Sequence, residues 1–194
     1  MMDAVIEIIK PGLWTTIQDG GRPGLRRYGV SPGGAMDRVS YRLANALVGN
    51  RAGESAIELT QLGARLRIRR DVLLAVCGAD MRPVAEGRPL PMGRPVWVRA
   101  GSTVAFGPAA FGRRAYVAVA GGIAAPSVLG GRGAYPAAGL AGLLGRPLRA
   151  GDVLAAGEPQ AAVGAGMRRL AEAAGREAAP LIAARWGVGG AMPQ

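Results

Sequence analysis

The sequence has 194 residues, 49% of them hydrophobic and only 5% aromatic, which allows one domain or two small ones with a core of Val, Leu, Ile and Ala. It contains no histidine and one cysteine, Cys77, which excludes the commonest general base, an internal disulfide and a Cys-based zinc site, so no metal site is expected. The net charge is +11, but the arginines are scattered without interleaved aromatic residues, which favours an anionic small molecule or an acidic partner subunit over nucleic acid.

The N-terminal quarter of the chain predicts two short strands, a long loop and one helix. Residues 4–9 alternate apolar and acidic side chains, and residues 13–17 form a second apolar piece. Residues 18–32 contain glycines and prolines and predict a loop. Residues 36–48 then carry apolar side chains at helical spacing, with Asp37 at the expected N-cap or first turn.

From Ser55 onward the hydrophobic period becomes two, which predicts many short strands separated by Gly- and Pro-containing turns. The predicted strands are residues 56–60, 64–68, 72–77, 84, 96–98, 103–106 and 115–120. This spacing is typical of a barrel or a sandwich. Residues 1–156 are therefore expected to form one mainly β domain with an early inserted helix.

The C-terminal segment, residues 157–194, differs in composition. It is rich in alanine and arginine and has little β character. It predicts two short helices broken at Gly175 and Pro180, or a poorly ordered tail.

The sequence pattern also bears on localisation. The N-terminal MMDAVIEIIK carries acids and no basic stretch, so no signal peptide is expected. No apolar run is long and charge-free enough to span a bilayer, so we expect a cytoplasmic protein without a membrane partner.

The glycine-rich loop before the first helix has two interpretations. A phosphate-binding loop would use backbone N–H groups and the positive end of the helix. However, the lysine of a P-loop is missing, and Asp37 lies where an anion would bind. From the residues alone we favour plain turns and a helix cap.

Three further residues are candidates for chemistry. Asp80 ends the buried strand CGAD, a placement common in active sites but also in turns. Glu58 lies within an apolar strand; facing a barrel lumen it would be a candidate base, and facing solvent it would be ordinary. Arg132 stands between glycines and either binds a carboxylate or phosphate or is solvated. Cys77 lacks a histidine to activate it and is interpreted as a buried apolar residue.

Six segments, taken together, resemble one family. They are PGLWTTIQDGGRPGLRRYGV, SPGGAMDRVSYRLANALVGN, AIELTQLGARL, AVCGAD, RAYVAVAGGI and VLGGRG. In this order and spacing they are similar to the biotin-dependent carboxyltransferase/allophanate hydrolase subunit 2 group, which includes the C component of 5-oxoprolinase (PxpC) and KipA-like proteins. The resemblance covers residues 5–157 and implies a cyclophilin-like β-barrel.

The resemblance also implies an activity and partners. It implies a subunit that, with a PxpB/KipI-like subunit and a PxpA-like subunit, hydrolyses 5-oxo-L-proline to L-glutamate, with ATP used by the complex. One alternative is a carboxyltransferase component that acts on urea or a related amide, with biotin carried by a partner. Another is a non-catalytic KipA-like regulator. Each enzyme substrate is a small amide, which needs groups that polarise a carbonyl.

The family's motif positions can be transferred residue by residue. We expect Asp37, Asp80 and Arg132 to be catalytic. The expected substrate-binding residues are Gln18, Asp19, Arg22, Gly34, Ser40, Asn45 and Glu58.

Two departures from the family pattern stand out. The family's Gly-Ser-Arg-Ser is Gly-Arg-Gly here, so two hydroxyl groups beside Arg132 are lost. Family members also continue into a second half, whereas this sequence ends at Gln194, so we expect a chain that lacks that half.

Overall fold

The computed structural model describes residues 4–139, 145–177 and 179–188. Its strands form two six-stranded antiparallel sheets, called sheets A and B. Sheet A has the order β11 (Val153–Ala155), β1 (Ala4–Lys10), β4 (Arg65–Ile68), β9 (Thr103–Ala105), β6 (Val84–Ala85), β7 (Arg88–Pro89). Sheet B has the order β12 (Leu181–Ala183), β8 (Pro95–Val98), β5 (Val72–Asp80), β10 (Phe111–Val119), β3 (Ala56–Thr60), β2 (Trp14–Gln18). The mainly β prediction is confirmed, although the strands form two sheets instead of one closed barrel.

Apolar side chains of the two sheets meet in the main core. Alternate residues of the longer strands point into it, including Ile57 and Leu59 of β3 and Val117 of β10. The intervening residues of sheet B, such as Ala56 and Tyr116, face the other way, toward the helices. Sheet B is therefore buried on both faces, which explains why its central strand β5 is a continuous apolar run.

The helix α1 (Arg38–Leu47) packs on the outer face of sheet B, against β5 and β10. Asp37 is its N-cap, and the Asp37 Oδ1 accepts hydrogen bonds of 3.0 Å from the backbone N–H groups of both Val39 and Ser40. Tyr41, Ala44 and Leu47 form its buried stripe. The predicted helix and cap are confirmed.

The C-terminal segment differs from its prediction. It forms one helix, α2 (Ala161–Glu177), that continues through Gly175, and the strand β12, which pairs with β8. The buried Ala174 packs in the helix-facing cluster, so tertiary contacts outweigh the glycine's low helix propensity. Residues 178 and 189–194 of the predicted tail lie outside the described residues, and the boundary after Ala156 stays a prediction.

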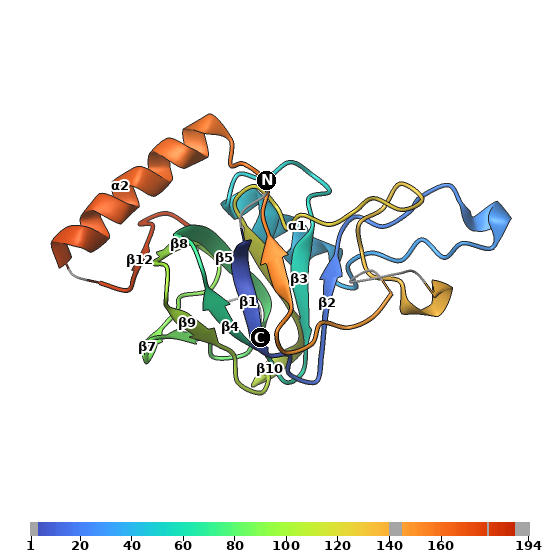
Figure 1. The fold of residues 1–194 in the computed structure, drawn as a ribbon, viewed down its shortest axis with the longest axis horizontal. Coiled ribbons are helices and arrows are strands. Elements are labelled where there is room, and N and C mark those ends of the chain that lie inside the picture. The colour runs from blue at the N-terminus through green and yellow to red at the C-terminus, as the bar shows by residue number, and fades with distance from the viewer. Residues whose placement is uncertain (1–3, 140–144, 178, 189–194) are drawn as a thin grey trace.

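Two long loops project from the sheets on the side opposite α2 (Figure 1). One, here called the arm, comprises residues 19–36 and carries the 3-10 turn η1 (Arg26–Tyr28). The other comprises residues 126–139 and ends in the turn η2 (Pro136–Ala138). A hydrogen bond of 3.3 Å from the Ser31 N–H to the Tyr135 hydroxyl joins them. Of the helices in the described ranges, none is long and apolar enough to cross a membrane.

Gly78 lies in β5 at a position where a side chain would be sterically unfavourable. It has a φ of +101°, and a Cβ atom built there lies 2.3 Å from the Arg114 carbonyl oxygen, beside an irregularity in the pairing with β10. We expect Gly78→Ala to lower the free energy of unfolding by roughly 2–5 kcal/mol. Gly87→Ala is the matched control: its φ is +74° but its surroundings are open, so we expect only about 1–2 kcal/mol. Urea unfolding followed by circular dichroism measures both, and equal losses would contradict the steric argument.

Candidate functional site

Most of the predicted site residues gather where the arm, the start of α1 and the 126–139 loop meet. Gln18 ends β2 and Asp19 begins the arm, and the Ala35 N–H donates a 2.9 Å hydrogen bond to the Asp19 carbonyl. The backbone of Gly34 passes so close to Gly21 that a Cβ atom on it would lie 2.7 Å from the Gly21 nitrogen. The arm thereby folds back on its own base, so that Ala35, which shortly precedes α1, lies beside Asp19 at the end of β2.

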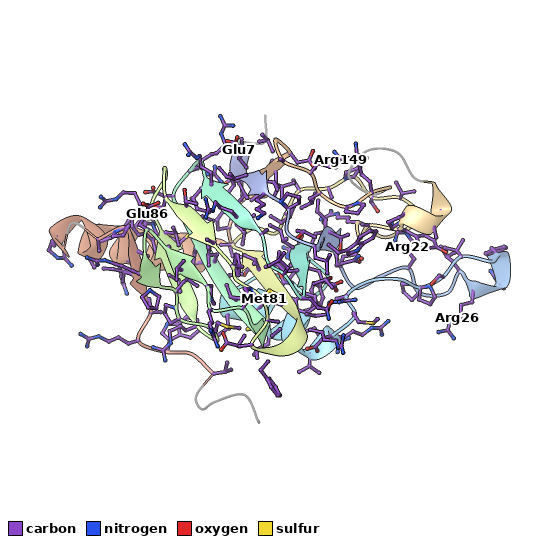
Figure 2. The ribbon with its side chains drawn as sticks, turned by 90° about the horizontal axis from the view of Figure 1, so that it is seen from below. Glu7, Arg22, Arg26, Met81, Glu86 and Arg149 are labelled. Atoms are coloured by element: carbon purple, nitrogen blue, oxygen red, sulfur yellow. The ribbon has the colours of Figure 1, made fainter. Side chains whose placement is uncertain are left out.

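Asp19 and Arg22 contact the loop that carries Arg132. The Arg132 N–H donates to the Asp19 Oδ2 at 2.5 Å. The Arg22 guanidinium, which is 1% exposed, donates to carbonyl oxygens of the same loop. Figure 2 shows Arg22 at the base of the arm and Arg26 toward its tip. Gln18 lies beside them, with its Nε2 3.1 Å from the Thr16 Oγ1.

Arg132 and Glu54 face an open cavity of about 760 Å³. The Arg132 Nη1 lies 3.2 Å from the Glu54 Oε2, and both side chains are partly exposed. Arg51, Asn50 and Glu158 also line the cavity, together with backbone of glycines such as Gly121 and Gly157. The arrangement offers two cations, two carboxylates and amide groups to a small polar ligand.

Asn45 and Tyr41 hold Glu54 through its backbone. The Tyr41 hydroxyl and the Asn45 Nδ2 donate to the Glu54 carbonyl oxygen at 2.6 and 3.2 Å. Burial, with the nearby carboxylates of Asp19 and Glu54, raises the pKa of the Tyr41 phenol, so it stays protonated and donates. Asn45 therefore shapes the cavity wall without lining the cavity.

Glu58, Asp37 and Ser40 form a buried network at the start of α1. Glu58 points to the helix-facing side of sheet B, so it faces neither the main core nor open solvent. Its Oε2 accepts from the Tyr116 hydroxyl at 2.8 Å and from the Met36 N–H at 3.0 Å. The Ser40 hydroxyl donates to the Asp37 Oδ2, so both Asp37 oxygens already serve the helix cap.

Asp80 is the one predicted site residue that lies apart. It pairs with Phe111 at the end of β5 opposite the Gln18 end of sheet B, it is exposed, and its Oδ1 accepts from the Arg82 N–H at 2.8 Å. The structure does not bring it together with Asp37 or Arg132. Its catalytic role stays a prediction that the geometry does not favour.

Sequence reasoning missed Glu54. It stands in the turn between α1 and β3, where an isolated acid is ordinary. The available signal was its position: Glu54 follows Gly53 and stands two residues before the start of the apolar strand that contains Glu58. Nothing local showed that Arg132, far along the chain, would meet it.

Cys77 behaves as an inert thiol. It is 3% exposed, and burial raises its pKa to about 11. Because the thiolate is the reactive form, we expect no labelling of the native protein by a disulfide reagent at about pH 8. The urea-unfolded chain should react fully in the same time, and equal rates would contradict the burial.

Comparison with known proteins places the chain in one family. The model of the carboxyltransferase domain, subdomains A and B, matches residues 28–189. Urea amidolyase of Lachancea kluyveri is 39% identical over 157 residues, which are 80% of this chain and 9% of that protein. The C component of the Escherichia coli 5-oxoprolinase is 37% identical over 154 residues, which are 79% of this chain and 50% of that protein.

Solved structures agree with the sequence comparison. The Kluyveromyces lactis urea carboxylase superposes with a TM-score of 0.78 at 35% identity, over 82% of this chain and 14% of that one. The chain spans half the length of the 5-oxoprolinase component and a smaller share of the urea enzymes. The family model covers most of the chain, and the chain therefore belongs to the carboxyltransferase domain family, subdomains A and B.

Proposed function

We propose that the chain is the C-type component of an ATP-dependent 5-oxoprolinase complex, which hydrolyses 5-oxo-L-proline to L-glutamate. The observation that carries the proposal is the cavity of about 760 Å³ with the Arg132 and Arg51 side chains in its wall. The substrate is a carboxylate, and a guanidinium binds a carboxylate through two parallel N–H···O bonds. Urea carries no charge and would leave these cations unused.

In this proposal the Arg132 guanidinium leaves its ion pair with Glu54 and binds the substrate carboxylate instead. Glu54 then lies free beside the bound lactam, where a carboxylate can accept a proton from water. Hydrolysis breaks the lactam C–N bond, adds the hydroxyl to the carbonyl carbon and leaves the proton on nitrogen. Asp37 and Gln18 do not contact the substrate in this proposal. Asp37 caps α1 and Gln18 ends β2, and both elements support the site.

We assign ATP to the partners, because the glycine-rich loop before α1 does not suit a phosphate. The N–H groups of Val39 and Ser40 at the start of α1 already bind the Asp37 carboxylate, which would also repel a phosphate. The proposed partners are a PxpB/KipI-like subunit and a PxpA-like subunit. Their presence is inferred from the likeness to the C component of 5-oxoprolinase.

Carboxyl transfer to urea or a related amide is the second candidate. It is favoured by the 39% identity with urea amidolyase and by the TM-score of 0.78 with urea carboxylase. Biotin would then be carried by a partner protein.

A reconstitution assay separates the candidates. The chain is mixed with PxpA-like and PxpB/KipI-like subunits, ATP and 5-oxo-L-proline, and glutamate is measured. We expect release that requires all components. A parallel sample uses a longer version with a second half like that of the 5-oxoprolinase C component. A further sample contains urea and a carboxylated biotin carrier protein. Urea-dependent loss of carboxybiotin in that sample, without glutamate release in the first, would support the second candidate instead. Stable binding to the PxpB/KipI-like subunit without either reaction would indicate a KipA-like regulator.

A further inference from the structure

Arg22 is a buried cation whose guanidinium donates its hydrogen bonds, within the described residues, to one loop. Its Nε donates to the Val128 carbonyl at 2.9 Å, and its Nη2 donates to the carbonyls of Gly133 and Gly131 at 2.8 and 3.4 Å. Among the described residues no carboxylate forms an ion pair with it. Buried arginines are normally paired, because an unpaired buried charge is costly. The carbonyl oxygens of the 126–139 loop therefore take the place of a carboxylate partner for this guanidinium.

Asp19 binds the same loop at the residue between those carbonyls. It is 5% exposed, and its Oδ2 accepts from the Arg132 N–H while its Oδ1 accepts from the Gly21 N–H at 2.8 Å. A carboxylate that accepts two backbone N–H groups makes stronger bonds than a neutral acceptor. Donors and acceptors of residues 131–133 are thus held by two opposite charges from the base of the arm.

The two glycines beside Arg132 make this contact sterically possible. A Cβ atom at Gly131 would lie 2.7 Å from the Arg22 Cγ, and one at Gly133 would lie 2.7 Å from the Asp19 Oδ1. A side chain at either position would displace the charged group that holds the loop. Neither glycine has a positive φ, so close packing, and not backbone conformation, requires them.

We propose that Arg22 and Asp19 are positioning residues that fix the 128–133 loop so that the Arg132 side chain faces the cavity. The Arg132 side chain is 45% exposed, and Glu54 is its one polar side-chain contact among the described residues, so its direction depends on its backbone. The fork of Arg22 supplies several bonds from one rigid group, which a lysine cannot reproduce. The proposal rests on the proposed function only in taking Arg132 as the group that binds substrate.

Hydrogen exchange at the amides of residues 128–133 tests the positioning directly, without any activity. In Arg22→Met we expect the Arg132 amide to exchange roughly ten- to a hundredfold faster, as loss of charge-assisted bonds implies. Asp19→Asn should act likewise, because the amide keeps one acceptor for two N–H groups. Arg22→Lys should recover only part of the protection. The control Arg69→Met removes an exposed partner of Glu7 in sheet A and should leave the loop unchanged.

A thiol reporter gives a second readout. Arg132→Cys introduces an exposed thiol into the loop, while the native Cys77 is buried and should not react. The labelling rate of the new thiol therefore reports how firmly the backbone of the loop is fixed. We expect faster labelling when Arg22→Met is added and an unchanged rate when Arg69→Met is added. Unchanged exchange and labelling in both Arg22→Met and Asp19→Asn would overturn the proposal.

The outcome for activity separates the two proposals. If the wild-type complex releases glutamate, Arg22→Met should raise KM for 5-oxo-L-proline by a larger factor than it lowers kcat, and Arg22→Lys should restore part of the KM. A loop that loses protection while KM stays unchanged would overturn the link to Arg132. If the wild-type complex releases no glutamate, the proposed function fails, and the exchange and labelling results decide the positioning role alone.

Discussion

Replacing Arg132 with methionine is expected to raise KM for 5-oxo-L-proline roughly ten- to a hundredfold in the reconstituted complex, as loss of hydrogen bonds to a charged group implies. The reason is the position of its guanidinium in the cavity wall, 3.2 Å from Glu54. Arg132→Lys keeps the charge but not the planar pair of N–H donors, so its KM should lie between those of the wild type and Arg132→Met. Initial rates of glutamate release over a range of substrate concentrations measure these effects.

Two controls make this result specific. Arg51→Met removes the other arginine that lines the cavity, and a smaller rise in KM is expected, because it is Arg132 that pairs with Glu54. Arg69→Met, just after β4 and paired with Glu7, should leave KM unchanged. Because Arg132 is partly exposed, its replacement should leave the thermal unfolding midpoint near that of the wild type. An unchanged KM with a normal midpoint would remove Arg132 from the site.

The elements with strong local signals were predicted from the sequence. The α1 helix has a capping aspartate and a helical apolar stripe, and β3 has its predicted bounds. The strands β7, β11 and β12 were not predicted, because each has only two or three residues. In addition, β11 and β12 form by pairing with strands that are distant in the sequence. The single helix α2 was also missed, since Gly175 is tolerated only through packing against sheet B.

The candidate site was predicted in part for a related reason. Asp37 was correctly assigned as a cap, because a cap depends on residues two and three positions away. Which strand ends lie together depends on the direction and register of strands that pair over long sequence distances, so the sequence could not separate Asp80 from Arg132. Likewise, the use of Asp19 and Arg22 depends on a loop more than 100 residues away.

Glu58→Ala is expected to cost the largest single loss of stability, about 3–5 kcal/mol in the free energy of unfolding, because it breaks a buried charged network. The substitution leaves the Tyr116 hydroxyl and the Met36 N–H without their acceptor. It also removes the ion pair of 3.5 Å with the Arg114 Nε, which has no other partner among the described residues. Urea unfolding at neutral pH, followed by circular dichroism, measures the loss.

Matched variants show whether the network, and not side-chain volume, sets that loss. Glu58→Gln keeps the shape and one acceptor oxygen, so its loss should be smaller than that of Glu58→Ala. Tyr116 remains a protonated donor, since burial raises the pKa of its phenol, so Tyr116→Phe removes one bond of the same network. A double-mutant cycle of Glu58→Gln with Tyr116→Phe should therefore show coupling. Glu7→Ala, in an exposed pair, should cost at most about 1 kcal/mol. Equal losses for Glu7→Ala and Glu58→Ala would contradict the role of Glu58 as the buried acceptor that joins the start of α1 to sheet B.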